Sequence, residues 1–324
     1  MQSTSARIAI RASGFLSSHN RFALLKLAFT FVILAWLIYY LRSNDLLAVL
    51  WQIKPSAILL TLGLLPVNLG LQFLKWHYVL RCAAPRHITP RASFFSLLAG
   101  LPLGLITPGR WGELGRAFFL PQIKQTKVVL LAAMDKIFDL LINVLLGACA
   151  LLYLIHKKLF PEMLFLPVVL LILCFAFMNV LALQPHALKS FARVLRKLHR
   201  KKFASLQALS RFSRRNLLAV WLLSLLFVLT YSLQFVILLR GFIDVAYFDG
   251  MIGAAATFFA KSLLPIAAGD LGVREGAAAF FFSRMGLLPQ AAFDASLLLF
   301  VINLLAPSLL GMLLIWKEQT ARRT

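Results

Sequence analysis

Long apolar runs separated by short polar stretches dominate this sequence of 324 residues. A run of about 18 or more apolar residues is long enough to cross a bilayer as a helix. Helices satisfy their own backbone hydrogen bonds inside lipid, whereas open sheets do not. We therefore predict an all-α polytopic membrane bundle that forms one transmembrane domain over residues 1–324. Six full spans are expected at Leu24–Leu41, Ala57–Leu74, Val129–Tyr153, Leu164–Leu183, Leu217–Leu239 and Ala292–Trp316.

Two further apolar stretches are interrupted by proline, glycine and charged residues. The first interruption covers residues 105–116 and the second covers residues 264–276. Each contains a proline, then two glycines three residues apart, then a Glu with an Arg nearby. Paired interruptions in corresponding halves of a chain indicate a transport site near the bilayer midplane. We therefore predict two re-entrant or broken helical hairpins in an inverted repeat. The residues expected to shape their backbone are Pro108, Gly109, Gly112, Pro265, Gly269 and Gly272.

Basic residues outnumber acidic ones, and the formal net charge is +23. The basic residues gather between apolar runs, a pattern typical of membrane topology and of contact with anionic lipid, so we expect no nucleic acid partner. With both hairpins re-entrant, the basic clusters fall on one side. This predicts a multi-pass protein with both termini in the cytoplasm. Lys75 is assigned to the basic flank after the second span.

Two polar regions are expected to be cytoplasmic. Residues 1–23 are interpreted as a basic tail in preference to an organellar transit peptide. Residues 185–216 form a basic loop. Its apolar residues recur with helical spacing, which fits an amphipathic helix on the inner leaflet, and a solvated linker fits its charge equally well.

The first interruption carries the elements of an anion site. Glu113 and Arg116 are three residues apart and share one face of a helix. Pro108 suits a helix start, so we predict that a helix begins at Gly109 and exposes its N–H groups beside Arg110. Helix N-termini and the Arg fork both bind phosphate.

The second interruption repeats this pattern. Arg274 and Glu275 are expected to open a helix after Pro265 ends the preceding one. Lys261 lies in the preceding apolar run, and Asp270 lies between the two glycines. Interfacial loops with snorkelling charges are the alternative. Because intramembrane charge is costly and usually functional, two matching motifs favour a site.

A carboxylate pair lies at the start of the third predicted span. Asp135 and Asp139 are four residues apart and share one helix face. Unpaired carboxylates inside a bilayer are costly, so we expect both to face the bundle interior and to meet Arg110, Arg116 or Arg274. In an alternative placement, Asp135 and Lys136 lie at the headgroup level. A carboxylate near the midplane could also couple transport to protons.

Other chemistries find little support in the sequence. The six histidines lack metal-ligand spacing, and we expect no metal and no cofactor. There is no Ser/His/Asp order and no nucleotide loop, so no catalytic residue is assigned.

These motifs carry a family resemblance. The chain shows Pro-Gly-Arg-x-Gly-Glu-x-x-Arg from Pro108, then Asp-Lys-x-x-Asp from Asp135, then Gly-x-Leu-Gly-x-Arg-Glu from Gly269. In this order it resembles the membrane domain of lysylphosphatidylglycerol synthases and its stand-alone relatives, the flippase-like integral membrane proteins. It departs at Asp135-Lys136, where the family more often has Glu-Arg, and at Asp270, where a Gly is more usual. Only residues 317–324 follow the last predicted span, so the aminoacyl-transfer activity of the synthases is not expected.

The resemblance implies a role in handling lipids. We predict a protein of the bacterial inner (cytoplasmic) membrane that is not an enzyme and that binds and translocates an anionic membrane lipid of the phospholipid or polyprenyl-phosphate type. The predicted substrate-binding residues are Arg110, Glu113, Arg116, Asp135, Asp139, Arg274 and Glu275. The three arginines would contact phosphate, and Arg274→Ala is expected to abolish translocation. The alternatives are an enzyme that modifies a lipid headgroup and a non-transporting partner of a lipid synthase or glycosyltransferase.

Overall fold

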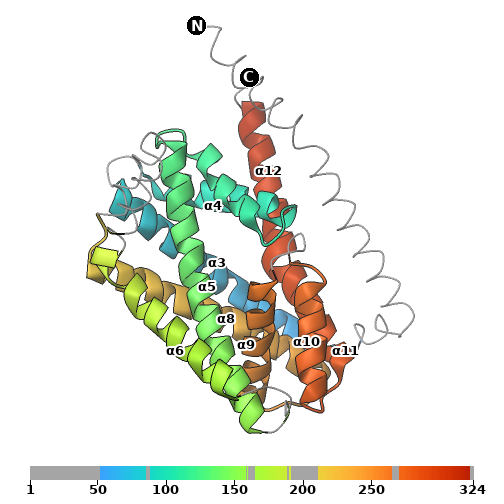
Figure 1. Cartoon of the computed structure of the whole chain (residues 1–324). Helices are drawn as coiled ribbons and strands as arrows, with labels where there is room; N and C mark the ends of the chain where they lie inside the picture. The colour runs from blue at the N-terminus through green and yellow to red at the C-terminus, as the bar shows by residue number, and fades with distance from the viewer. Residues whose placement is uncertain are drawn as a thin grey trace, which may run out of the picture.

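The computed structural model describes residues 52–84, 88–157, 159, 165–187, 190, 211–264 and 270–321. Every regular element in these residues is helical, which confirms the all-α polytopic bundle (Figure 1). Several predicted features lie outside the described residues. They are the tail 1–23, the span Leu24–Leu41, most of the loop 185–216, Pro265 and Gly269.

Five apolar helical segments are long enough to cross a membrane, and they coincide with five of the predicted spans. Four of them are α3 (Pro55–Ala83), α5 (Gln125–His156), α6 (Phe165–Ala182) and α8 (Arg214–Phe242). The fifth is continuous through α11 (Pro289–Phe300), the π-helical turn η3 (Val301–Leu305) and α12 (Ala306–Ala321). Most of these helices extend beyond the predicted apolar runs, because helical hydrogen bonding continues into the polar residues at their ends.

Four shorter helices form the two interrupted pairs. The first pair is α4 (Pro90–Leu105) with the 3₁₀-helix η1 (Trp111–Phe119), and the second is α9 (Tyr247–Leu263) with α10 (Val273–Arg284). The longest of the four has 17 residues. At a rise of about 1.5 Å per residue it extends roughly 25 Å, less than the ~30 Å hydrocarbon core of a bilayer. None of these four helices is among the segments that are long and apolar enough to cross a membrane by themselves.

The first interruption is a tight turn between α4 and η1. Gly109 and Arg110 both have φ 58°, in the left-handed region. The Gly112 N–H donates to Thr107 Oγ1 at 2.6 Å, and a Cβ built on Gly112 would lie 1.9 Å from the Leu103 carbonyl oxygen. The prediction that a helix begins at Gly109 is wrong. Two left-handed residues reverse the chain first, and a 3₁₀-helix then begins at Trp111.

The second interruption ends with left-handed residues as well. Asp270 has φ 62° and Gly272 has φ 83°, and α10 begins at the next residue. The Glu275 carboxylate accepts a hydrogen bond from the Gly272 N–H at 2.8 Å, which satisfies a donor at the helix start. The prediction that Arg274 and Glu275 lie in the first turn of a new helix is confirmed.

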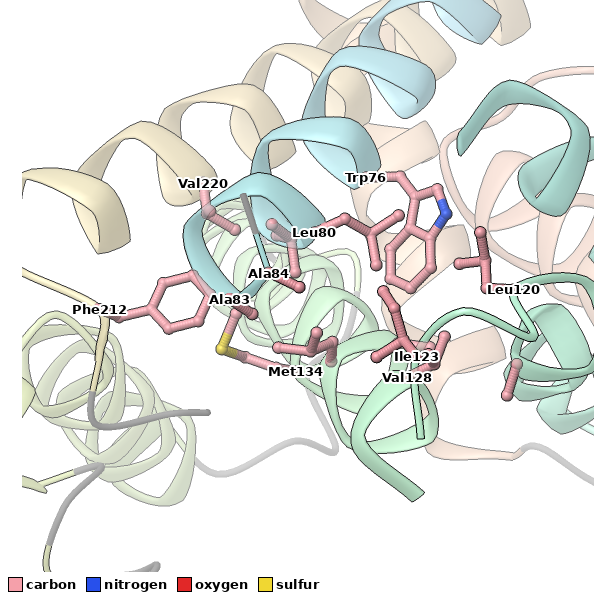
Figure 2. Packing of buried hydrophobic residues seen from close by; sticks show 14 of the residues in the cluster. Trp76, Leu80, Ala83, Ala84, Leu120, Ile123, Val128, Met134, Phe212 and Val220 are labelled. Atoms are coloured by element: carbon pink, nitrogen blue, oxygen red, sulfur yellow. The ribbon is translucent and has the colours of Figure 1, made fainter. Parts of the chain in front are cut away.

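A first apolar cluster packs the N-terminal interruption against the long helices. It joins α3, η1, α5 and the start of α8, and its buried residues include Trp76, Leu80, Leu120, Val128 and Val220 (Figure 2). The indole N–H of Trp76 donates to Ser96 Oγ of α4 at 2.9 Å. This cluster fixes η1 beside the middle of the bundle.

A second cluster does the same for the C-terminal interruption. It joins α8, α9, α10 and α11 through residues such as Phe235, Ala254, Phe282 and Ala292. α5 connects the two halves, since it packs against η1 on one side and against α9 on the other, and it crosses the bundle in Figure 1 (green). The fold thus brings both interruptions to the same helix.

Candidate functional site

One cavity of about 340 Å³ lies where the two interruptions approach α5. Its wall includes Gly109, Arg110, Glu113 and Arg116 of the first interruption and Asp270 of the second. α3, α5, α8 and α9 complete the wall. Their polar contributions are Gln72, Lys75, Asp135, Lys136, Asp139, Asn143, Tyr231, Lys261 and Ser262. Segments more than 150 residues apart in sequence therefore share one polar interior site.

Glu113 is the centre of an ion cluster on the first interruption. Its carboxylate lies 2.6 Å from the guanidinium of Arg110, 2.9 Å from that of Arg116 and 3.0 Å from Lys136 Nζ. The Glu113 side chain is only 4% exposed, so these charges interact with little screening by water. Three cations hold one carboxylate at the cavity wall.

Arg116 extends this cluster to α5 and α3. Its guanidinium donates to Asp135 at 3.0 Å, and it lies 5.1 Å from the ring centroid of Trp76. Asp135 also lies 3.1 Å from Lys75 Nζ, and Lys75 donates to Asp139 at 2.5 Å. Opposite charges therefore alternate from η1 through α5 to α3.

The predicted partners of the α5 carboxylates are partly confirmed. Asp135 meets Arg116, as expected, and it is buried inside the bundle. Asp139 meets Lys75 instead of an arginine. The assignment of Lys75 to a basic flank outside the span is wrong, because α3 continues beyond Leu74 and buries Lys75 to 1% exposure.

The second interruption contributes a separate ion pair. Lys261 of α9 lies 3.1 Å from the Asp270 carboxylate. Asp270 also interacts electrostatically with Arg110 of the first interruption. A charged group from each interruption thus faces the other across the cavity.

Arg274 and Glu275 lie behind the cavity wall rather than on it. The Arg274 side chain is 2% exposed, and it pairs with the adjacent Glu275 carboxylate. It also donates to Ser296 Oγ and to Tyr231 Oη, both at 2.9 Å. Since Tyr231 lines the cavity, Arg274 is connected to the site through this tyrosine.

Sequence reasoning did not assign Lys75, Lys136, Lys261 or Tyr231 to the site. A signal for the lysines was present, because each lies in or beside an apolar run, where a charge is costly and needs a partner of opposite charge. Tyr231 gave no such signal among the aromatic residues of α8. In the part of the chain that the structure describes, no three His, Cys, Asp or Glu side chains are placed to hold a metal ion.

Comparison with known protein families gives a match over most of the chain. The family described as lysylphosphatidylglycerol synthase TM region matches residues 23–311, a range that contains both interruptions and every residue of the cavity wall. No curated protein matches the chain.

Proposed function

The chain belongs to the lysylphosphatidylglycerol synthase TM region family, and from this premise we propose that it binds an anionic lipid headgroup and carries it across the bilayer. The family is a membrane region associated with lipid chemistry, and the match includes no catalytic domain. The main support for the proposal is a cavity that the two interruptions share, because both contribute charged residues to its wall. Ionisable groups inside a membrane bundle usually mark the pathway of a polar substrate.

The apolar part of the cavity wall supports a lipid over a soluble anion. Trp111, Ile137 and Leu140 line the cavity, and their exposed fractions are 61%, 50% and 42%. The cavity therefore reaches the apolar outer surface beside η1 and α5. A phospholipid could place its headgroup among the charges while its acyl chains stay in the bilayer.

The cavity residues divide into contact groups and positioning groups. Arg110 and Lys136 are the more exposed cations of the Glu113 cluster, at 18% and 28%, and they would contact the phosphate. Arg116, Asp135, Asp139 and Lys75 would hold η1 against α5 and α3. Arg274 and Glu275 would position Tyr231 from behind the wall.

The two interruptions would act as the moving parts of an inverted repeat in the bacterial inner membrane. In this proposal both termini are cytoplasmic, and the hairpins enter from opposite faces, as charge bias predicts. Left-handed residues at Gly109, Arg110, Asp270 and Gly272 supply positions where the backbone can change conformation at moderate cost.

Reconstitution into vesicles tests this function. Purified protein would be placed in liposomes that contain a fluorescent acyl-labelled phosphatidylglycerol, and label in the outer leaflet would be destroyed by a membrane-impermeant reductant. We expect the protein to make the protected pool accessible, and Arg110→Gln to slow this exchange strongly. Exchange no faster than in protein-free vesicles would refute the proposal.

The same vesicles separate transport from headgroup chemistry. Lipids extracted after incubation would be resolved by chromatography. An unchanged headgroup supports translocation, whereas a modified headgroup would support a membrane enzyme instead.

A further inference from the structure

The cavity wall has an uneven charge balance that points to the charge of its ligand. Among the residues that the structure describes, five basic and four acidic side chains line it. The basic residues are Lys75, Arg110, Arg116, Lys136 and Lys261, and the acidic residues are Glu113, Asp135, Asp139 and Asp270. The part of the second interruption that is not described, residues 265–269, contains no ionisable side chain.

Three of these cations can each be matched with a different carboxylate. Lys261 pairs with Asp270 at 3.1 Å, and Lys75 pairs with Asp139 at 2.5 Å. Arg116 pairs with Asp135 at 3.0 Å. Behind the wall, Arg274 and Glu275 neutralise each other.

The remaining charges meet at Glu113. This one carboxylate is shared by Arg110 at 2.6 Å and by Lys136 at 3.0 Å, in addition to Arg116. Within the described residues, one positive charge therefore lacks a counter-charge, and it is located at the most exposed cations of the cluster. An uncompensated charge inside a membrane bundle is unfavourable, so a ligand that supplies one negative charge here is stabilised.

We infer that the cavity selects a phospholipid headgroup with a single net negative charge, a phosphodiester without an amine, whose phosphate lies between Arg110 and Lys136. This inference rests on the proposed transport function and adds the ligand's charge to it. A zwitterionic headgroup would leave the excess cation unmatched. A phosphomonoester, with about 1.5–2 negative charges at neutral pH, would overcompensate it. An aminoacylated, net cationic headgroup would add to the excess.

Transport of four acyl-labelled lipids in proteoliposomes tests the inference. The probes are phosphatidylglycerol (one negative charge), phosphatidylethanolamine (zwitterionic), lysylated phosphatidylglycerol (net positive) and phosphatidic acid (a phosphomonoester). We expect the wild-type protein to move phosphatidylglycerol about tenfold faster than each of the others, as charge mismatch in a partly buried site would produce. Equal rates for phosphatidylglycerol and either amine-bearing lipid would overturn the inference.

Charge-changing variants should shift the preference in opposite directions. Asp270→Asn adds one positive charge and should move the optimum to phosphatidic acid. Asn adopts the left-handed conformation of this position, so the charge changes without backbone strain. Lys136→Gln removes one positive charge and should move the optimum to phosphatidylethanolamine. If Lys136→Gln fails to fold, the Asp270→Asn shift decides the question.

Matched control variants separate the effect of charge inside the cavity from the effect of the net charge of the whole protein. Asp244→Asn and Lys54→Gln make the same changes at exposed positions and should leave the order of the four lipids unchanged. If the wild type, Asp270→Asn and Lys136→Gln all transport the four lipids in the same order of rates, the inference about the ligand's charge is overturned. The proposed transport function would still stand. Absence of transport for every lipid in the wild type would instead refute the proposed function itself.

Discussion

Arg110 and Asp270 carry opposite charges, lie 160 positions apart in the chain, and line the same cavity. In the part of the chain that the structure describes, they are the two non-glycine residues with positive φ. Such residues tend to occur where function requires a strained backbone. Their meeting joins the two interruptions into one site, and the stability of that site depends on the buried ion pairs around it.

Arg116 should be required for stability as well as for the site. Arg116→Ala leaves Glu113 and Asp135 with one cation fewer in a buried setting, and breaking such a pair costs about 3–5 kcal/mol. We expect a marked fall in the thermal unfolding midpoint in detergent. Asp244→Ala, which breaks an exposed pair with Arg240, is the control and should leave the midpoint unchanged. Equal midpoints for the two variants would contradict this role.

Lys75 and Asp139 should behave as a coupled pair. Lys75→Met removes the partner of Asp139 and should lower stability strongly, since a carboxylate inside the bundle loses its counter-charge. The double variant Lys75→Met/Asp139→Asn should recover about half of this loss or more, because the uncompensated charge is gone. The stability of the single and double variants would be measured by unfolding monitored by tryptophan fluorescence. Additive losses in the double variant would rule out the coupling.

Arg274 should hold Tyr231 in position at the cavity wall through the hydrogen bond between them. Tyr231→Phe removes the 2.9 Å hydrogen bond between them and leaves the buried Arg274–Glu275 pair in place. We expect folding to be retained and lipid exchange to slow about tenfold, the equivalent of about 1.4 kcal/mol. Tyr247→Phe, at an exposed position of α9, serves as the control. This test is cleaner than Arg274→Ala, because that change would leave the Glu275 carboxylate buried without its partner. Unchanged exchange in Tyr231→Phe would remove the tyrosine from the mechanism.

Gly112 should tolerate no side chain. The Cβ of Gly112→Ala would lie 1.9 Å from the Leu103 carbonyl oxygen, so α4 and η1 would have to separate. We expect destabilisation of about 1–3 kcal/mol or more. Gly63→Ala is the matched control, because nothing lies within 4 Å of its Cβ, and helix propensity predicts a gain of up to about 1 kcal/mol. A midpoint for Gly112→Ala at or above that of wild type would show that the turn relaxes freely.

Several features of the fold could be predicted because they depend on local sequence. The spans at α3, α5, α6, α8 and α11–α12 follow from apolar runs of about 18 or more residues, the length that lets a helix cross a bilayer. The helix start just before Arg274 follows from the glycines that precede it, and α10 begins at Val273. The start expected at Gly109 failed, because Gly109 and Arg110 are both left-handed and the 3₁₀-helix begins only at Trp111.

The sequence by itself determined which segments enter the membrane and where two of them break, since both properties are settled by the cost of placing local groups in lipid. Tertiary structure decided which charges meet. Three contacts depend on how α3, α5, α8 and the two interruptions pack. Asp139 pairs with Lys75 instead of an arginine, and Arg274 is buried behind Tyr231. Glu113 is shared by three cations. Ion pairing inside a bundle is a property of distances between helices, and these distances are set by side-chain packing across the whole chain.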